Sequence, residues 1–162
     1  MTPPLKVEVG PVRVEDDQFL PVPESLAGRA HPAIEPESQA FFEGLAENRL
    51  VLQLCGDCGR YTHFPVGGCM WCGSNVIRPA EVDGCGNLYT FTVCYLSFGP
   101  GMEPPYVVAF VELDCQPGLQ IMSNIVGCRI SDLRIGMRLR PRFAHEGDLS
   151  VLLYEPDDGG GR

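Results

Sequence analysis

Two short cysteine pairs constrain the fold of this chain more than any other feature of its sequence. Cys55 and Cys58 form one C-x-x-C pair, and Cys69 and Cys72 form a second pair after a spacer of ten residues. This spacing is typical of a site in which four thiolates surround one metal ion. The chain contains eight cysteines, which could also indicate a disulfide scaffold, but the paired spacing of these four suits a metal better.

The predicted metal site is structural, because four cysteines leave no open coordination position for a substrate. Zn²⁺ accepts a tetrahedral shell of four sulfurs, and iron in a rubredoxin-like site is the alternative. Gly59 and Gly73 each follow the second cysteine of a pair, where positive φ would turn backbone N–H groups toward the sulfurs. His63 lies between the pairs and is interpreted as a turn residue.

The rest of the sequence predicts a mainly β protein in four parts. Residues 1–34 carry six prolines and are expected to form an extended arm, either disordered or packed on the body or on a partner. Residues 35–82 are expected to hold one helix, at 36–48, followed by the four-cysteine ribbon. Residues 83–155 are expected to form a barrel, and residues 156–162 a disordered tail.

Alternating apolar residues predict the strands. Residues 50–54 lead directly into the first cysteine pair, and residues 76–82 form a returning strand after the second pair. Five further strands with glycine-rich corners fit a small closed barrel of the OB type, with a sandwich as the alternative. These five strands are predicted at residues 87–96, 107–113, 119–126, 137–143 and 149–154.

The first barrel strand carries the strongest alternation. Tyr89, Phe91 and Val93 are expected to share one face of it. Gly84 and Gly86 precede this strand, where a bulge or a sharp bend is expected.

Charge and hydropathy exclude some partners. The formal net charge of −9 disfavours binding to a phosphate backbone, which requires clustered Lys and Arg. No apolar run approaches the roughly 20 residues of a membrane-spanning helix, so no membrane contact is expected. The N-terminus has no apolar core of the signal-peptide type. A cytoplasmic location is therefore expected, in agreement with cysteines that hold a metal.

The sequence contains no motif for catalysis by this chain alone. There is no G-x-S-x-G elbow, no H-E-x-x-H helix and no Walker loop. Three histidines, His31, His63 and His145, are scattered along the sequence without a paired nucleophile. We therefore expect no enzymatic activity from the isolated chain.

Taken in order, several segments resemble a known family, the domain-of-unknown-function family number thirty-five. The resemblance covers about residues 34 to 155 and implies a rubredoxin-like zinc ribbon joined to an OB-fold. Besides the strand at 50–54 and the cysteine pairs, it rests on Phe41-Phe42-Glu43-Gly44-Leu45, Gly84-Cys85-Gly86-Asn87-Leu88-Tyr89-Thr90-Phe91-Thr92, Pro105-Tyr106-Val107-Val108-Ala109 and Asp132-Leu133-Arg134-Ile135-Gly136-Met137.

The resemblance implies a non-catalytic accessory subunit in acyl-CoA metabolism. Members of the family associate with thiolase-superfamily enzymes, among them thiolases, acyltransferases and aldolases that shorten sterol side chains. A hetero-oligomer is therefore expected, in which the complex holds the acyl-CoA substrate. The alternative is a nucleic-acid-binding module, since zinc ribbons and OB-folds serve that purpose elsewhere, although the net charge argues against it.

Two features are candidate contacts with the partner or with coenzyme A. Phe98 and Met102 lie in the loop between the first two barrel strands, where they would contact a partner or an acyl chain unless they pack on the barrel rim. Arg138, Arg140 and Arg142 alternate with apolar residues and should line the outer face of one strand. A solvated strand face is the simpler interpretation, and binding to acidic residues or CoA phosphates is the sharper one.

Overall fold

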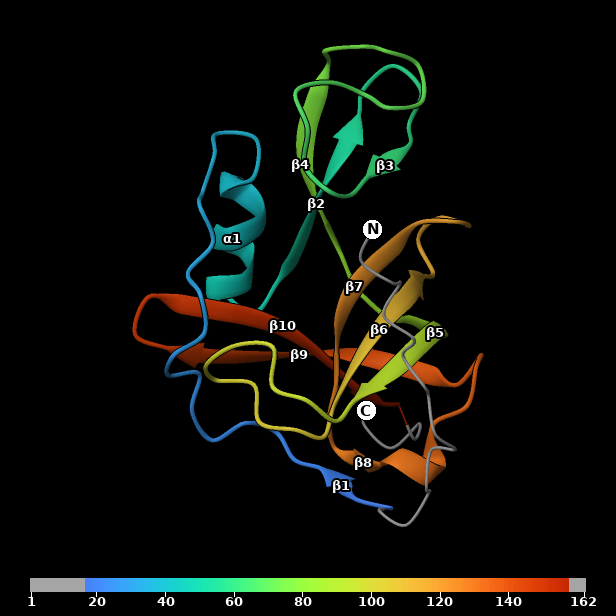
Figure 1. The fold of residues 1–162 in the computed structure, drawn as a ribbon. Helices are drawn as coiled ribbons and strands as arrows, with labels where there is room; N and C mark the ends of the chain where they lie inside the picture. The colour runs from blue at the N-terminus through green and yellow to red at the C-terminus, as the bar shows by residue number, and fades with distance from the viewer. Residues whose placement is uncertain (1–16, 158–162) are drawn as a thin grey trace, which may run out of the picture.

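Five strands form a closed barrel that makes up most of the protein (Figure 1). The computed structural model describes residues 17–157, so residues 1–16 of the expected arm and 158–162 of the expected tail lie outside the described residues. The barrel order is β10-β7-β6-β5-β9, which confirms the predicted OB-type barrel over the sandwich. Its strands are β5 (Gly86–Cys94), β6 (Tyr106–Leu113), β7 (Gln120–Ile125), β9 (Arg138–Glu146) and β10 (Leu149–Pro156).

The barrel interior is filled by the inward residues of these strands. Leu88, Val111 and Leu139 are fully buried, and apolar burial of this kind is the main stabilising term of the fold. Tyr154 is also fully buried, and its hydroxyl donates a hydrogen bond to the carbonyl oxygen of Gly84 at 2.9 Å. Burial raises the pKa of Tyr154, so its hydroxyl stays neutral and remains a donor.

The first barrel strand departs from its prediction at one residue. The pairing of β5 with β6 shifts register between Leu88 and Thr90, which marks a β-bulge. Tyr89 is 52% exposed as a result, whereas Phe91 and Val93 pack against the core. The prediction of a shared face is therefore confirmed for Phe91 and Val93 and wrong for Tyr89, because the extra residue resets the alternation.

A smaller sheet lies above the barrel and carries the cysteines (Figure 1). It consists of β2 (Leu50–Cys55), β3 (Tyr61–Thr62) and β4 (Ile77–Val82), in the order β3-β2-β4. We call residues 50–82 the ribbon. Helix α1 (Gln39–Ala46) packs against β2 and β10 and so joins the ribbon to the barrel.

The helix predicted at 36–48 is confirmed, but α1 is shorter at both ends. The N–H of Ser38 donates to the carbonyl oxygen of Glu35 at 2.9 Å, which closes a turn ahead of the helix. Asn48 adopts a left-handed φ of 59°, a conformation that ends helices. Among the described residues, no helix is long and apolar enough to span a membrane.

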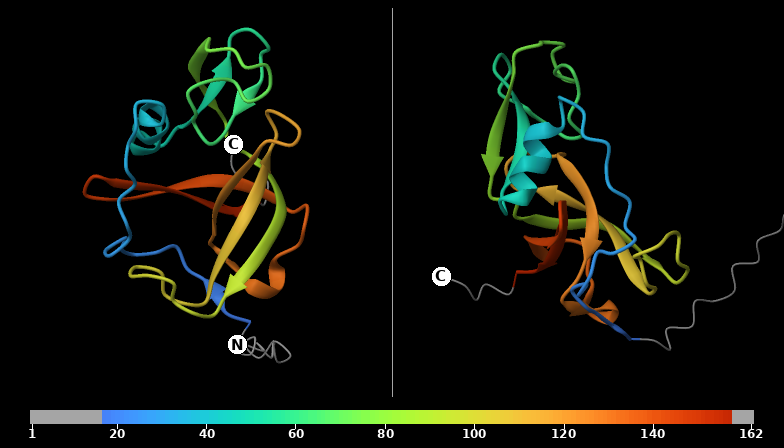
Figure 2. Two further views of the ribbon diagram at one scale, coloured as in Figure 1. Left: turned by 45° about the horizontal axis from the view of Figure 1, so that its top comes forward. Right: turned by 90° about the vertical axis from the view of Figure 1, so that its left-hand side faces the viewer.

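The described part of the arm runs along the barrel before it reaches α1 (Figure 2). Strand β1 (Phe19–Leu20) pairs with β8 (Cys128–Arg129), which is followed by the short 3₁₀ helix η1 (Ile130–Asp132). Leu20 and Leu26 are both 2% exposed, so they anchor the arm in the core. Farther along, the carboxylate of Glu146 accepts hydrogen bonds from the Ser25 hydroxyl, at 2.7 Å, and from the N–H of Leu26.

Glu146→Gln should loosen the arm, because a neutral amide is a weaker acceptor for these donors. The hydrogen bonds from Ser25, Leu26 and Ala27 lower the pKa of Glu146 below its ordinary value of 4.5. A carboxyl with a lowered folded pKa contributes stability that is fully present above the ordinary pKa. That contribution is lost as the pH falls through the lowered pKa, so wild-type protein should release its arm only below about pH 4.

Limited trypsin cleavage after Arg29 measures this effect at neutral pH. We expect Glu146→Gln to be cleaved several-fold faster than wild type. Glu35→Gln makes the same chemical change at an exposed arm residue and should leave the rate unchanged. Equal cleavage of all three proteins would contradict the anchoring role of Glu146.

Candidate metal centre

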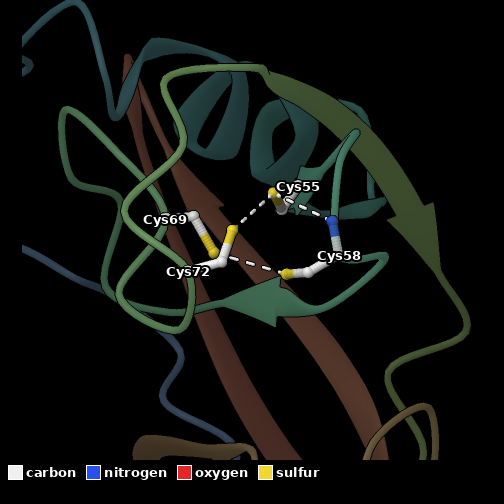
Figure 3. A group of neighbouring side chains, drawn as sticks. All are labelled: Cys55, Cys58, Cys69 and Cys72. Atoms are coloured by element: carbon white, nitrogen blue, oxygen red, sulfur yellow. Dashed lines mark hydrogen bonds between the residues drawn. The ribbon is translucent and has the colours of Figure 1, made fainter.

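The four paired cysteines converge at one end of the ribbon (Figure 3). Cys55 ends β2, Cys58 lies in the following turn, and Cys69 and Cys72 lie in the loop between β3 and β4. Their sulfur atoms all lie within 4.8 Å of one another. The Cys55 and Cys72 sulfurs are 3.7 Å apart, and those of Cys58 and Cys69 are 3.6 Å apart.

These separations fit a single tetrahedral ion. Four metal–sulfur bonds of about 2.3 Å in tetrahedral geometry place neighbouring sulfurs about 3.8 Å apart. A disulfide would require about 2.0 Å, and none of the four cysteines forms one. The donor set therefore suits a metal held by four thiolates, in a closed shell that stabilises structure. Tetrahedral sulfur ligation suits both zinc and iron.

The two cysteine turns have the same backbone conformation. Gly59 has a φ of +69° and its N–H donates to the Cys55 carbonyl oxygen at 3.0 Å, and Gly73 has a φ of +75° and donates to that of Cys69 at 2.9 Å. The predicted positive φ of both glycines is confirmed. In the first turn the N–H of Cys58 points at the Cys55 sulfur, 3.5 Å away, and lowers the pKa of that thiol to about 6.

His63 lies outside the sulfur cluster, as its interpretation as a turn residue requires. Its ring centroid lies 5.2 Å from that of Phe41 in α1 and 4.6 Å from that of Phe64. Burial lowers the pKa of His63 to about 4, so the ring is neutral at physiological pH. The residue therefore packs the ribbon against the helix.

One barrel side chain, which sequence reasoning missed, connects the barrel to the ribbon. Gln116, in the loop between β6 and β7, accepts a hydrogen bond from the N–H of Tyr61 at 2.8 Å and donates to its carbonyl oxygen at 3.2 Å. The indole N–H of Trp71 donates to the same carbonyl at 3.0 Å. Arg60 lies 4.7 Å above the Trp71 ring and covers it. A lone glutamine in a loop has no periodic signal that would predict this contact.

Gln116→Ala should reduce the free energy of unfolding by about 1–2 kcal/mol, because two hydrogen bonds to part-buried backbone groups are lost together. Urea denaturation of the metal-loaded protein measures the change. Gln39→Ala removes an exposed glutamine from α1 and should cost less than about 0.5 kcal/mol. The coupling is absent if the two variants are equally stable.

The prediction that the histidines lack a paired nucleophile is wrong for His145. Its Nδ1 lies 2.9 Å from the Ser150 hydroxyl and its Nε2 lies 2.9 Å from the side-chain oxygen of Asn48. Ser150 and His145 are cross-strand partners in the β9–β10 hairpin, so these bonds fasten the end of α1 to the hairpin. Glu43 and Asp148 line the adjacent cavity, where their carboxylates would oppose the oxyanion of an acyl-transfer reaction.

The predicted contact residues lie apart from the sulfur cluster. Phe98 is 77% exposed on the loop between β5 and β6, whereas Met102 in the same loop is partly covered. Arg138, Arg140 and Arg142 line the outer face of β9 as predicted, but each is already in an ion pair. Arg138 pairs with Asp114, and the other two pair with Glu155. A CoA phosphate would have to compete with these carboxylates.

Two described families match the two structural units. Residues 42–76 match the family described as ChsH2, rubredoxin-like zinc ribbon domain. Residues 80–144 match the family described as ChsH2, C-terminal OB-fold domain.

Curated relatives include subunits of hydratases. A probable enoyl-CoA hydratase alpha subunit of Thermomonospora curvata is 37% identical over 109 residues, or 67% of this chain and 34% of the relative. The 3-oxo-4,17-pregnadiene-20-carboxyl-CoA hydratase alpha subunit of Mycobacterium tuberculosis is 29% identical over 85% of this chain and 44% of the relative. A DUF35 domain-containing scaffold protein of Methanocaldococcus jannaschii is 28% identical over 63% of this chain and 64% of the relative. The chain thus spans between a third and two thirds of the length of these relatives.

Solved structures share the whole arrangement of ribbon and barrel. A chain of the Ltp2-ChsH2(DUF35) aldolase is 32% identical, with a TM-score of 0.71 over 78% of this chain and 98% of that chain. A DUF35 protein of unknown function from Sulfolobus solfataricus is 19% identical, with a TM-score of 0.56 over 75% of this chain and 86% of that chain, and shares the fold.

Proposed function

This chain belongs to the DUF35/ChsH2 family of proteins that join a zinc ribbon to an OB-fold, and from that premise we propose that it is a non-catalytic subunit supporting a thiolase-like enzyme. The enzyme would act on acyl-CoA thioesters, with retro-aldol shortening of a steroid-type side chain as the favoured reaction. The chain would act as a scaffold that stabilises the enzyme and shapes its substrate entrance.

One observation carries the proposal. The chain aligns with 98% of a chain of the Ltp2-ChsH2(DUF35) aldolase at 32% identity. The similarity to a steroid-CoA hydratase alpha subunit supports the same substrate class, and a hydratase subunit is a further candidate partner. A closed four-thiolate site is suited to holding structure and offers no position for a substrate.

We also propose zinc as the metal. The matched family is described as a zinc ribbon, and Zn²⁺ has no geometric preference that these four sulfurs would violate. Bound there, the ion would fix the two cysteine turns and so hold the ribbon in shape. Gln116 and α1 would transmit that order to the barrel.

Nucleic-acid binding is the weaker alternative. A phosphate backbone requires cations that are available to release its counterions. The described arginines that are already paired with carboxylates of the chain are Arg49, Arg129, Arg138, Arg140 and Arg142.

Co-expression with a thiolase-like enzyme encoded beside this chain tests the proposal. We expect one complex in size-exclusion chromatography, with both chains identified by mass spectrometry. The enzyme expressed alone should be insoluble or at least about ten-fold less active on acyl-CoA, because it would lack this support. A thiolase-like enzyme from an unrelated locus is the control and should not co-elute. A partner that is fully soluble and active alone contradicts the scaffold role.

A further inference from the structure

A cavity of about 380 Å³ lies between the arm, the β5–β6 loop and β7. In Figure 2 the arm and this loop run side by side below the barrel. Apolar residues form much of the lining, among them Leu20, Pro105 and Ile125. Arg29 and Asn124 also line the cavity and supply its polar groups.

The side chain of Arg29 is held in a fixed position at this cavity. Its Nε donates to the carbonyl oxygen of Gly101 at 3.1 Å, and its Nη1 lies 3.5 Å from the side-chain oxygen of Asn124. Asn124 is itself oriented, since its amide nitrogen donates to the carbonyl oxygen of Val107 at 2.8 Å. A guanidinium has five N–H donors, so three of them lack a partner within residues 17–157.

Backbone contact between the arm and the loop sets this position. Gly28 has a φ of +83°, and a Cβ there would lie 2.9 Å from the Cβ of Pro100. Gly101 has a φ of +73°, and a Cβ there would lie 2.6 Å from the carbonyl oxygen of Ala27. The two glycines let the segments touch directly, so Arg29 projects from a packed junction.

The charge of Arg29 is not compensated by the described part of the chain. The guanidinium is half-buried, and burial lowers the pKa of Arg29 below its ordinary value. Glu24 and Glu103 line the same cavity from exposed positions, but neither forms an ion pair with Arg29. A partly desolvated charge without a counter-charge is unfavourable, and an anion bound by the free donors would relieve that cost.

We propose that this cavity binds a carboxylate carried on an apolar group. The carboxylate would accept hydrogen bonds from the unpaired donors of Arg29, whose forked geometry matches two carboxylate oxygens. The apolar group would lie against Leu20, Pro105 and Ile125. The two glutamates would repel a doubly charged phosphate more strongly than a singly charged carboxylate. The volume lies in the range of small-molecule sites.

Calorimetric titration of the full chain with octanoate, octanamide and inorganic phosphate tests the proposal without a partner enzyme, so its failure is separate from that of the scaffold role. We expect octanoate to bind at least about ten-fold more tightly than octanamide, because only the carboxylate gains charge-assisted bonds. Phosphate should bind more weakly than octanoate. Equal affinity for octanoate and octanamide, or phosphate binding as tight as that of octanoate, would overturn the proposal.

Variants locate the binding. Arg29→Gln should weaken octanoate binding at least about ten-fold. Arg78→Gln removes an exposed arginine of the ribbon, outside this cavity, and should have no effect. Glu103→Gln should strengthen binding, because it removes a competing negative charge from the cavity lining. Unchanged octanoate affinity in Arg29→Gln contradicts the assignment, and the comparison of octanoate with octanamide on wild-type protein decides the matter if that variant does not fold.

Discussion

Cys55→Ser should abolish stoichiometric metal binding and unfold the ribbon. Cys55 is 2% exposed, ends β2, and supplies one of the four sulfurs that lie within 4.8 Å of one another. The ribbon is too small to hold its own core, so metal binding free energy is folding free energy for this segment. For structural zinc in small domains that free energy is on the order of 10 kcal/mol.

Trypsin provides the readout, because Arg60 and Arg78 lie in the ribbon. Cleavage at these two residues should be on the order of 100-fold faster in Cys55→Ser, as expected for a segment that opens locally. Cys94→Ser replaces a half-buried cysteine outside the cluster and should keep both the metal and the protease resistance. Resistance retained by Cys55→Ser would show that the ribbon folds without its metal.

Gly86→Ala should destabilise the barrel by about 3 kcal/mol or more, since large-scale overlap with backbone is among the costliest single changes. Gly86 pairs with Leu113 of β6 and with Leu139 of β9, so it lies where the barrel closes. A Cβ there would lie 2.2 Å from the carbonyl oxygen of Glu112. That atom belongs to the paired strand and cannot move away without breaking the hydrogen-bonded ladder.

Chemical denaturation followed by circular dichroism measures this loss. Gly99→Ala is the matched control, because a Cβ at Gly99 would meet nothing within 4 Å in the β5–β6 loop. The control should change stability by less than about 0.5 kcal/mol. A Gly86→Ala variant as stable as this control would mean that the strands do not approach each other so closely.

Local patterns were sufficient to predict the strands and the cysteine cluster. In β9, Leu139 is buried while Arg138 and Arg140 are exposed, as period-two alternation requires. Gly59 and Gly73 were predictable for a similar reason, since the conformation of each cysteine turn depends on neighbouring residues. Such signals are contained within a few residues, and the fold class follows from their order along the chain.

Contacts between distant residues account for what the sequence left unpredicted. Gln116 lies 55 residues from Tyr61, and Arg29 lies 72 residues from Gly101, so no local pattern brings them together. The bulge at Tyr89 arises from strand pairing and reverses the alternation that was used to predict its face. Ser150 and His145 meet only because the hairpin register sets them opposite each other.

Native mass spectrometry of the purified, untreated chain tests the central claim most directly. One ion bound to the four thiolates of Cys55, Cys58, Cys69 and Cys72 is what holds the ribbon, and through it the docking face, in shape. The account predicts a folded chain carrying one zinc ion, which a chelator removes together with the narrow charge-state distribution. A folded chain at its metal-free mass, with the four thiols unmodified, would contradict it.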